Sequence, residues 1–335
     1  MIIAEIAQAH DGSLGTAHAY IEALSDTGVD AVKFQTHIAE AESSQFEPFR
    51  VKFSKQDKTR LEYWKRMEFT IDQWKELKSH AESLNMEFIS SPFSLRAVEI
   101  LEEVGVKRYK IGSGEVSNFL MLEKIAGTGK PMILSSGMSN WNELDKAVLF
   151  LQDYGNQLSI LQCTTAYPTQ PDQWGLNVIA ELKSRYQVPV GFSDHSGDIF
   201  GCLAAATLGA EIFEFHVVFD KRQFGPDTQA SITIDQTKTL VKGIRAIQTA
   251  LLNPIVKDDN QGFTALKQIF EKSLAINKDL PKGHIISLAD LESKKPKGYG
   301  IPANQFDEVV GKELSKNLEK WEFLNWEDLI KINHE

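Results

Sequence analysis

The chain has 335 residues, 42% of them hydrophobic and 24% charged, with a formal net charge of −10; this length suits one large domain plus a small one. The negative charge argues against nucleic-acid or anionic-membrane surfaces, which need basic patches, and no apolar run is long enough to span a bilayer. Two cysteines, Cys163 and Cys202, are too few for a disulfide framework and the N-terminus lacks a signal-peptide pattern, so we expect a cytoplasmic protein.

Up to about residue 252, short apolar runs rich in β-forming residues alternate with amphipathic stretches. This alternation is typical of a parallel sheet covered by helices. The runs that we interpret as strands lie at residues 2–6, 30–34, 86–90, 107–111, 131–135, 158–162, 188–192 and 211–215. Eight strands with helices between them predict an α/β fold, a TIM (β/α)8 barrel, over residues 1–252.

Capping residues mark the start of two of the predicted helices. Thr70 precedes an apolar stripe of helical spacing over 71–81, and Asn140 with Glu143 resembles a capping pair. Between the second and third strands, the segment 37–70 is rich in charged and aromatic residues. We interpret it as a long insertion, and loops of that length are usually functional or disordered.

The alternation stops after about residue 252. Residues 253–272 are predicted to form a linker with a short helix at 264–272. Residues 273–335 are interrupted every few positions by Lys-Gly, Gly-Tyr-Gly or Pro, which suits a small β-rich module. A module of that size is marginally stable alone, so we expect it to dock on another surface.

Polar residues follow every predicted strand, where a TIM barrel carries its catalytic groups. In chain order they are Gln8, His10 and Asp11; Lys33 and Gln35; Ser90 and Ser91; Lys110 and Ser113; Ser135 and Ser136; Thr164, Thr165 and Tyr167; Ser193, Asp194 and His195; and His216 with Asp227. Any one of them could be structural. Eight consecutive strand ends of this kind predict an active site.

Two histidines, His195 and His216, end neighbouring strands and could share one divalent cation. A lone histidine is more often a structural residue, but a pair at adjacent barrel ends favours metal binding. Because only two protein nitrogens are offered, oxygens from water, substrate or a carboxylate would complete the shell. That donor set suits an octahedral ion such as manganese, magnesium, iron or cobalt better than structural zinc, and Mn²⁺ is the ion that we predict, with Mg²⁺ or Co²⁺ as alternatives.

Lys33 and Lys110 are each the one basic residue at the end of an otherwise apolar strand. Either could reach solvent or pair with a carboxylate such as Glu5 or Glu115. Four serines follow neighbouring strands: Ser91, Ser113, Ser135 and Ser193. Ammonium groups beside hydroxyls favour a phosphate-binding cradle.

Short motifs spread over nearly the whole chain resemble those of one enzyme family. They are VKFQ (32–35), SPF (91–93), YKIGSGE (109–115), ILSSGM (133–138), CTTAYP (163–168), FSDHS (192–196) and GPD (225–227). With them the chain resembles the sialic acid synthases, which include N-acetylneuraminate, legionaminate and pseudaminate synthases. Its C-terminal KGHIISLADLESKKPKGYGI resembles the antifreeze-protein-like (SAF) domain of these enzymes.

The resemblance implies condensation of phosphoenolpyruvate with the open-chain aldehyde of an N-acetylated hexosamine, a mannosamine or a diacetamido sugar. The products are a nine-carbon 2-keto-3-deoxy acid and phosphate, and the enzyme is a domain-swapped homodimer. The implied roles are phosphoenolpyruvate binding by Ser91, Lys110, Ser113, Ser135 and Ser193, metal binding by His195 and His216, and sugar binding by Gln35, Tyr167 and Asp227. Lys33 and Lys110 would stabilise anionic groups, and Asp11 or Glu214 would handle the proton of water. Lys295 stands where the family has an arginine that reaches the sugar from the partner subunit.

Three other functions remain open. One is a related synthase that makes a 2-keto-3-deoxy sugar acid from another aldose, such as an octulosonate or heptulosonate phosphate. Another is a Schiff-base aldolase with Lys110 or Lys33 as its nucleophile. The last is an inactive carbohydrate-binding relative of these enzymes.

Overall fold

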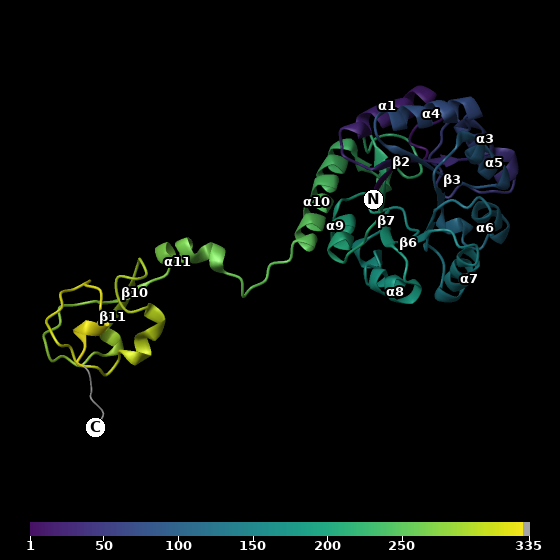
Figure 1. Ribbon diagram of the computed structural model, residues 1–335. Helices are drawn as coiled ribbons and strands as arrows, with labels where there is room; N and C mark the ends of the chain where they lie inside the picture. Colours follow the sequence, from purple (N-terminus) through teal and green to yellow (C-terminus); the bar gives the residue numbers. More distant parts are fainter. Residues whose placement is uncertain (331–335) are drawn as a thin grey trace. The chain divides into compact units, whose positions relative to one another are not determined.

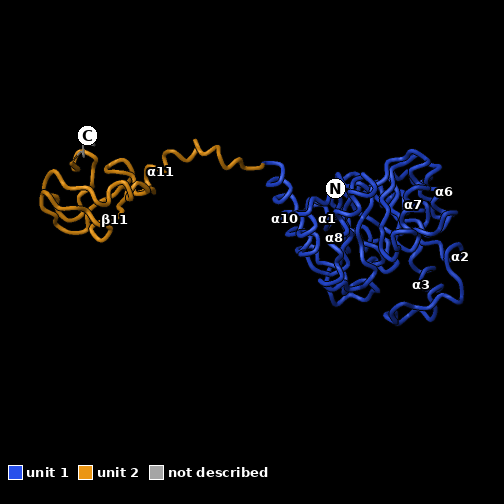
Figure 2. Tube along the Cα trace, turned by 90° about the horizontal axis from the view of Figure 1, so that it is seen from below, with its two compact units in different colours: residues 1–253 blue, residues 254–335 orange. Residues whose placement is uncertain are grey.

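The structure is a computed structural model that describes residues 1–330 of the chain; the last five residues of the predicted C-terminal module lie outside the described residues. The chain divides into two compact units, residues 1–253 and 254–335 (Figure 2). Within the described residues, no helix has the length and apolar character needed to cross a membrane.

The first unit is a closed parallel barrel, as the alternating pattern predicted (Figure 1). Its strands are β1 (Ile2–Glu5), β2 (Ala31–Thr36), β3 (Glu87–Pro92), β4 (Tyr109–Ile111), β5 (Met132–Ser135), β6 (Leu158–Cys163), β7 (Val190–Asp194) and β8 (Phe213–Val218). Each strand pairs with the next, and β1 pairs with β8 to close the barrel. The short β9 (Ile232–Thr233) pairs in parallel with the C-terminal end of β8. Closure brings every strand's C-terminal end to one face.

A ring of helices covers the outside of the barrel (Figure 1). They are α1 (Leu14–Ser25), α4 (Ile71–Ser83), α5 (Leu95–Val104), α6 (Phe119–Ala126), α7 (Trp141–Gln152), α8 (Asn177–Tyr186), α9 (Phe200–Thr207) and α10 (Ile234–Leu252). Thr70 and Asn140 cap α4 and α7 in full capping boxes, which confirms both predicted helix starts.

Side-chain alternation along the strands divides the barrel into two layers. Inside the barrel lies an apolar layer of Ile3, Ala31, Ile89, Ile133, Leu161 and Ile212. Because successive side chains of a strand point to opposite faces, the next inward positions lie two residues further along. Those positions are Glu5, Lys33, Ser91, Ser135, Cys163 and Glu214. The barrel interior therefore changes from apolar to polar as it approaches the C-terminal ends of its strands.

The insertion after β2 is ordered and partly helical, which corrects its interpretation as a loop. It contains α2 (Ala39–Glu42) and α3 (Arg60–Met67), and Thr59 caps α3 in a capping box. Tyr63, Trp64 and Met67 bury their side chains in a cluster of their own. This aromatic cluster holds the insertion as a folded element.

The second unit has a separate small core. It contains α11 (Thr264–Phe270) and the antiparallel pair β10 (Ser273–Ile276) and β11 (Leu291–Lys294). Its buried apolar side chains are Leu274, Ile276, Leu280, Ile286, Ile301, Val309, Leu314, Leu318, Leu324 and Leu329. The fold is thus a TIM barrel followed by a small β-rich domain, as predicted.

Candidate active site

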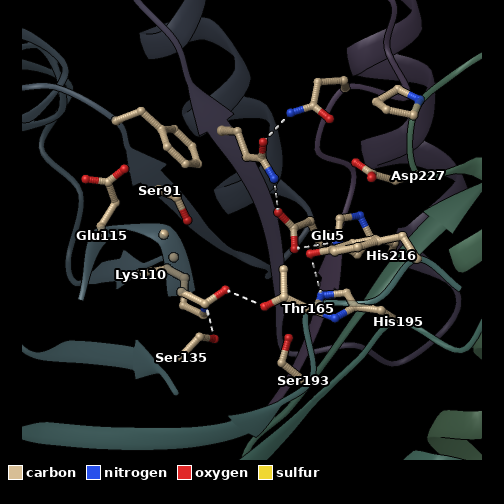
Figure 3. A pocket seen from close by; sticks show the side chains of 18 of the residues that line it. Glu5, Ser91, Lys110, Glu115, Ser135, Thr165, Ser193, His195, His216 and Asp227 are labelled. Carbon is tan, nitrogen blue, oxygen red and sulfur yellow. Dashed lines mark hydrogen bonds and ion pairs between the residues drawn. The ribbon is translucent and has the colours of Figure 1, made fainter. Parts of the chain in front are cut away.

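A cavity of about 390 Å³ opens at the C-terminal ends of the barrel strands (Figure 3). The residues that were given a role in binding or catalysis line it except for Asp11 and Lys295; they are Lys33, Gln35, Ser91, Lys110, Ser113, Ser135, Tyr167, Ser193, His195, Glu214, His216 and Asp227. Of the other polar residues at the strand ends, Gln8 and Thr165 line the cavity, whereas His10, Ser90, Ser136, Thr164 and Asp194 do not. Residues from all eight barrel strands and from the loops that follow them meet there. The structure therefore brings residues from distant parts of the chain together in one cavity.

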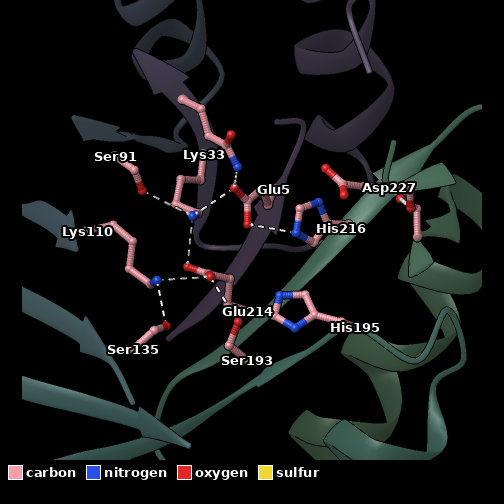
Figure 4. A network of polar contacts seen from close by, with 12 residues as sticks. Glu5, Lys33, Ser91, Lys110, Ser135, Ser193, His195, Glu214, His216 and Asp227 are labelled. Atoms are coloured by element: carbon pink, nitrogen blue, oxygen red, sulfur yellow. Dashed lines mark hydrogen bonds and ion pairs between the residues drawn. The ribbon is translucent and has the colours of Figure 1, made fainter. Parts of the chain in front are cut away.

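The floor of the cavity is an ion quartet formed by Glu5, Lys33, Lys110 and Glu214 (Figure 4). Lys33 Nζ lies 2.9 Å from Glu5 Oε1 and 3.4 Å from Glu214 Oε2. Lys110 Nζ lies 3.3 Å from Glu214 Oε1. All four side chains are at most 3% exposed. Burying isolated charges is very costly, and here each ammonium group has a carboxylate beside it that offsets this cost.

Serine hydroxyls surround the two ammonium groups. Lys110 Nζ donates to Ser135 Oγ at 2.7 Å, and Lys33 Nζ donates to Ser91 Oγ at 3.4 Å. Ser193 Oγ donates to Glu214 Oε1 at 3.0 Å. This clustering of N–H and O–H donors is the chemistry of a site for an anion that carries several oxygens.

The environment shifts the pKa values of Lys110, Lys33 and Glu5 in different directions. Burial lowers the pKa of Lys110, against the pull of Glu214. Burial also opposes the charge of Lys33, but Glu214 and Glu5 together raise its pKa. For Glu5, burial is outweighed by His216 and Lys33, which lower its pKa. Lys110 is thus the cation that gains most from an incoming anion.

His195 presents one ring nitrogen to the cavity as a hydrogen-bond acceptor. Its Nδ1 lies 3.1 Å from the Thr164 carbonyl oxygen, which only accepts, so Nδ1 carries the proton. Burial lowers the pKa of His195 to about 3, so the imidazole is neutral. Its Nε2 then has a lone pair, and the Tyr167 hydroxyl lies 3.2 Å from it. A neutral imidazole whose other nitrogen donates to a carbonyl is oriented for metal binding.

His216 lies beside His195, with 5.3 Å between the ring centroids. Its Nε2 is 3.3 Å from Glu5 Oε2, so a carboxylate oxygen adjoins the pair. Among residues 1–330, no set of three or more His, Cys, Asp or Glu side chains is gathered as a complete ligand group. Two imidazoles with one nearby carboxylate fit a cation that takes its remaining ligands from water and substrate.

Gln35 links the quartet to the outer part of the cavity. Its Nε2 donates to Glu5 Oε1 at 2.6 Å, and its Oε1 accepts from Gln8 Nε2. His37 Nε2 lies 3.1 Å from the same Oε1, and His37 Nδ1 contacts Glu42 at 2.7 Å. A continuous polar chain thus runs from α2 to the barrel floor.

The insertion contributes side chains that the sequence analysis did not name. Those that line the cavity are His37, Glu42, Glu47, Arg50, Arg60 and Trp64. Arg60 stacks over the Trp64 ring at 4.1 Å, and Trp64 Nε1 donates to Glu47 at 3.0 Å. The signal available in the sequence was the density of charged and aromatic residues in this segment, which identified it as functional or disordered but not by residue.

Two predicted residues lie elsewhere. Asp11 is about half exposed and pairs with Arg66 at 2.7 Å, because the turn after β1 passes through a positive φ of 50° at this residue. Lys295 belongs to the second unit, where its Nζ lies 4.8 Å from the centre of the Phe270 ring. Two carboxylates were considered as partners for the lysines. Glu5 does pair with Lys33, whereas Glu115 accepts a hydrogen bond from Asn118 Nδ2.

The chain is similar to known proteins over most of its length. Residues 20–255 match the NeuB family and residues 271–330 match the SAF domain. The N,N'-diacetyllegionaminic acid synthase of Campylobacter jejuni is 37% identical over 97% of this chain and 98% of its own length. The human N-acetylneuraminate-9-phosphate synthase is 34% identical over 95% and 89%. The crystal structure of N-acetylneuraminic acid synthetase from Leptospira borgpetersenii, in complex with citrate, has a TM-score of 0.70 and 29% identity over 79% of this chain and 89% of that one.

Proposed function

The chain belongs to the NeuB family of enzymes, and from that premise we propose that it joins phosphoenolpyruvate to the open-chain aldehyde of an N-acylated aminohexose. The products would be a nine-carbon 2-keto-3-deoxy sugar acid and inorganic phosphate. The observation that carries this proposal is the buried pair Lys33 and Lys110 among serine hydroxyls, directly beside two metal-competent histidines.

Phosphoenolpyruvate has two anionic groups, and the floor of the cavity offers donors for both. Lys110 with Ser135 and Lys33 with Ser91 supply two ammonium–hydroxyl pairs. Ser113 and Ser193 line the same space. Because these donors are already oriented in a buried site, they stabilise charge without reorganising during the reaction.

His195 and His216 would hold a divalent cation, Mn²⁺ by our prediction or else Mg²⁺ or Co²⁺. When bound, such a cation polarises a carbonyl oxygen as a Lewis acid. The protein's own contribution is to keep His195 neutral by burial and to hold its Nδ1 proton on Thr164. Gln35, Tyr167 and Asp227 line the space where the rest of the aldose would lie.

In the reaction, C3 of the enol attacks the aldehyde carbon, forming the new C–C bond. The aldehyde oxygen becomes a hydroxyl by taking up a proton, and water adds to the electron-poor C2 with loss of a proton. Cleavage of the bond between C2 and the ester oxygen then releases phosphate and leaves the 2-keto group. Glu214 is our candidate to take the proton from water, because it lines the cavity between Lys33 and Lys110. Asp11 was the other candidate, and its pairing with Arg66 outside the cavity disfavours it.

We also infer a homodimer in which the second unit of one chain completes the site of the other. This inference is supported by the apolar side chains that α11 exposes, among them Leu266, Ile269 and Phe270, which a partner surface would cover. Lys295 lies against Phe270 and would be presented together with that surface.

The direct test is phosphate release from phosphoenolpyruvate in the presence of a panel of N-acetylated and diacetamido hexoses. We expect release with at least one sugar and a product whose mass equals the sugar plus pyruvate. A Schiff-base aldolase is the competing chemistry, favoured by the lowered pKa of Lys110. Borohydride trapping of a lysine adduct, together with activity that survives chelation, would establish that competitor and refute our proposal.

A further inference from the structure

Arg50 connects the insertion to the outer part of the cavity. Its Nη2 donates to Asp227 Oδ1 at 2.7 Å and to the Pro226 carbonyl oxygen at 3.2 Å. Its guanidinium carbon lies 4.4 Å from the centre of the Tyr167 ring. One side chain of the insertion therefore contacts the loops that follow β6 and β8, and all four residues line the cavity.

Most of the donor capacity of Arg50 is not used by the protein. Among the described residues, its hydrogen bonds to protein acceptors come from Nη2. A guanidinium has five N–H donors in one plane, so those on Nε and Nη1 are left for a ligand. The side chain is 43% exposed, which gives a ligand access to it. Its stacking on Tyr167 already orders it, and this reduces the entropy lost on binding.

Arg50 belongs to the half of the cavity that the aldose would occupy. Tyr167, on which it stacks, has its hydroxyl 3.2 Å from His195 Nε2. The lysines suited to phosphoenolpyruvate lie deeper and are 3% exposed. A sugar whose aldehyde approaches the histidines would extend past Tyr167 toward Arg50 and Asp227.

Negative charge exceeds positive charge around this outer part of the cavity. The charged residues lining it are Glu42, Glu47, Glu115 and Asp227 against Arg50 and Arg60. Each arginine is already paired, Arg50 with Asp227 and Arg60 with Glu47 at 3.3 Å. A phosphate dianion would meet more carboxylates than guanidinium groups, and unfavourable like-charge contacts reject such a ligand. A sugar without a phosphate escapes this repulsion.

The geometry points to Arg50, paired with Asp227, as a recognition residue for the aldose, and to an aldose that carries no phosphate. This inference rests on the proposed function. Asp227 accepts from a sugar hydroxyl or an amide N–H, and Arg50 donates to a hydroxyl or acyl oxygen. The pair thus offers an acceptor and a donor side by side, which matches a neutral sugar with both kinds of group.

The role of Arg50 is tested with Arg50→Gln, using Arg222→Gln as the control. Arg222 is 90% exposed and pairs with Asp220 at 2.6 Å, so its loss removes the same charge away from the cavity. We expect Arg50→Gln to lower kcat/KM for the aldose about 10- to 100-fold, as for loss of a charged hydrogen bond, with the KM for phosphoenolpyruvate within about twofold. Arg50→Lys, which keeps the charge without the planar fork, should recover part of this loss.

Two results would overturn the assignment of Arg50. An aldose KM equal to that of the unaltered enzyme would mean that Arg50 does not touch the sugar. A parallel rise in both KM values with a lower Tm would mean that it only braces the insertion.

The selectivity is tested by comparing N-acetylmannosamine, its 6-phosphate and a diacetamido hexose as acceptors. A higher kcat/KM for an unphosphorylated sugar supports the inference, and Glu47→Gln/Glu115→Gln should then narrow the discrimination against the phosphate ester. Preference for the 6-phosphate overturns the selectivity and leaves the proposed function standing. Absence of phosphate release with every sugar refutes the proposed function and this inference with it.

Discussion

Replacing Lys110 with methionine separates the structural role of the ion quartet from its role in binding an anion. Methionine keeps much of the length and the apolar stem of the side chain but removes its charge. Glu214 then has Lys33, at 3.4 Å, as its remaining cation in the quartet. The buried floor of the cavity therefore carries one negative charge in excess, at the place where phosphoenolpyruvate must bind.

The geometry sets the size of both effects of this substitution, the loss of stability and the loss of phosphoenolpyruvate binding. At the 3.3 Å between Lys110 Nζ and Glu214 Oε1, Coulomb's law with an effective dielectric constant of about 20 gives about 5 kcal/mol before desolvation is subtracted. Breaking a buried pair costs about 3–5 kcal/mol. Because Lys33 still compensates Glu214, we expect Lys110→Met to lose about 3 kcal/mol of unfolding free energy. That loss corresponds to a fall of about 6–12 °C in Tm for a barrel of this size. Loss of a charged partner to the bound anion costs about 2–5 kcal/mol, so kcat/KM for phosphoenolpyruvate should fall about 30- to 5000-fold.

A double variant and a surface control make this test specific. Lys110→Met/Glu214→Gln removes the excess charge, so it should regain part of the lost Tm without regaining affinity for phosphoenolpyruvate. Lys75→Met breaks an exposed pair with Glu103 at 2.9 Å and should change neither quantity. Tm is measured by thermal unfolding and kcat/KM by phosphate release. A Lys110→Met enzyme with unchanged kcat/KM for phosphoenolpyruvate would refute the anion-binding role.

Three further predictions concern the histidines of the cavity, the buried His10 and the second unit. His195→Ala and His216→Ala should each abolish phosphate release while the circular dichroism spectrum is kept, and a chelator should do so reversibly; undiminished activity after chelation would exclude the metal. Burial lowers the pKa of His10 to about 3. Below pH 6.5 the unfolded chain therefore binds a proton that the folded chain does not. The free energy of unfolding should fall by about 1.4 kcal/mol for each pH unit below that value. Denaturant unfolding at pH 7 and pH 5 should therefore show a smaller loss of unfolding free energy for His10→Gln than for the unaltered protein. Equal losses in the two proteins would contradict the lowered pKa of His10. Mixing inactive His216→Ala with an inactive Lys295→Glu variant should restore partial activity if each site is shared between subunits, and a mixture that stays inactive despite subunit exchange, shown by mass, would exclude that dimer.

The barrel and the location of its site could be predicted because both follow from local repeats in the chain. Apolar runs separated by amphipathic stretches specify parallel strands and covering helices. A polar residue at the end of such a run then lies at the C-terminal face of the barrel. This placement does not depend on the distances between side chains of different strands. Lys33, Lys110, His195 and His216 were identified in this way, and all four line the cavity.

The insertion shows where local pattern is insufficient. α2 has four residues and α3 has eight, too few for a helical period to stand out. Such short helices are stabilised by tertiary packing more than by their own propensity. Here Tyr63, Trp64 and Met67 supply that packing, and the resulting fold brings Arg50 to the cavity.

Only the tertiary structure decided which charges meet. Glu214 comes between Lys33 and Lys110 because β8 pairs with β1 and closes the barrel, so residues from distant parts of the chain share one floor. Arg50 contacts Asp227 across 177 positions of sequence. Residue types and periodicity are properties of a chain segment, and they determined the fold class and the strand ends that carry polar groups. Ion pairing depends on distances of a few ångströms between segments, and those distances exist only once strand closure and loop packing have set them.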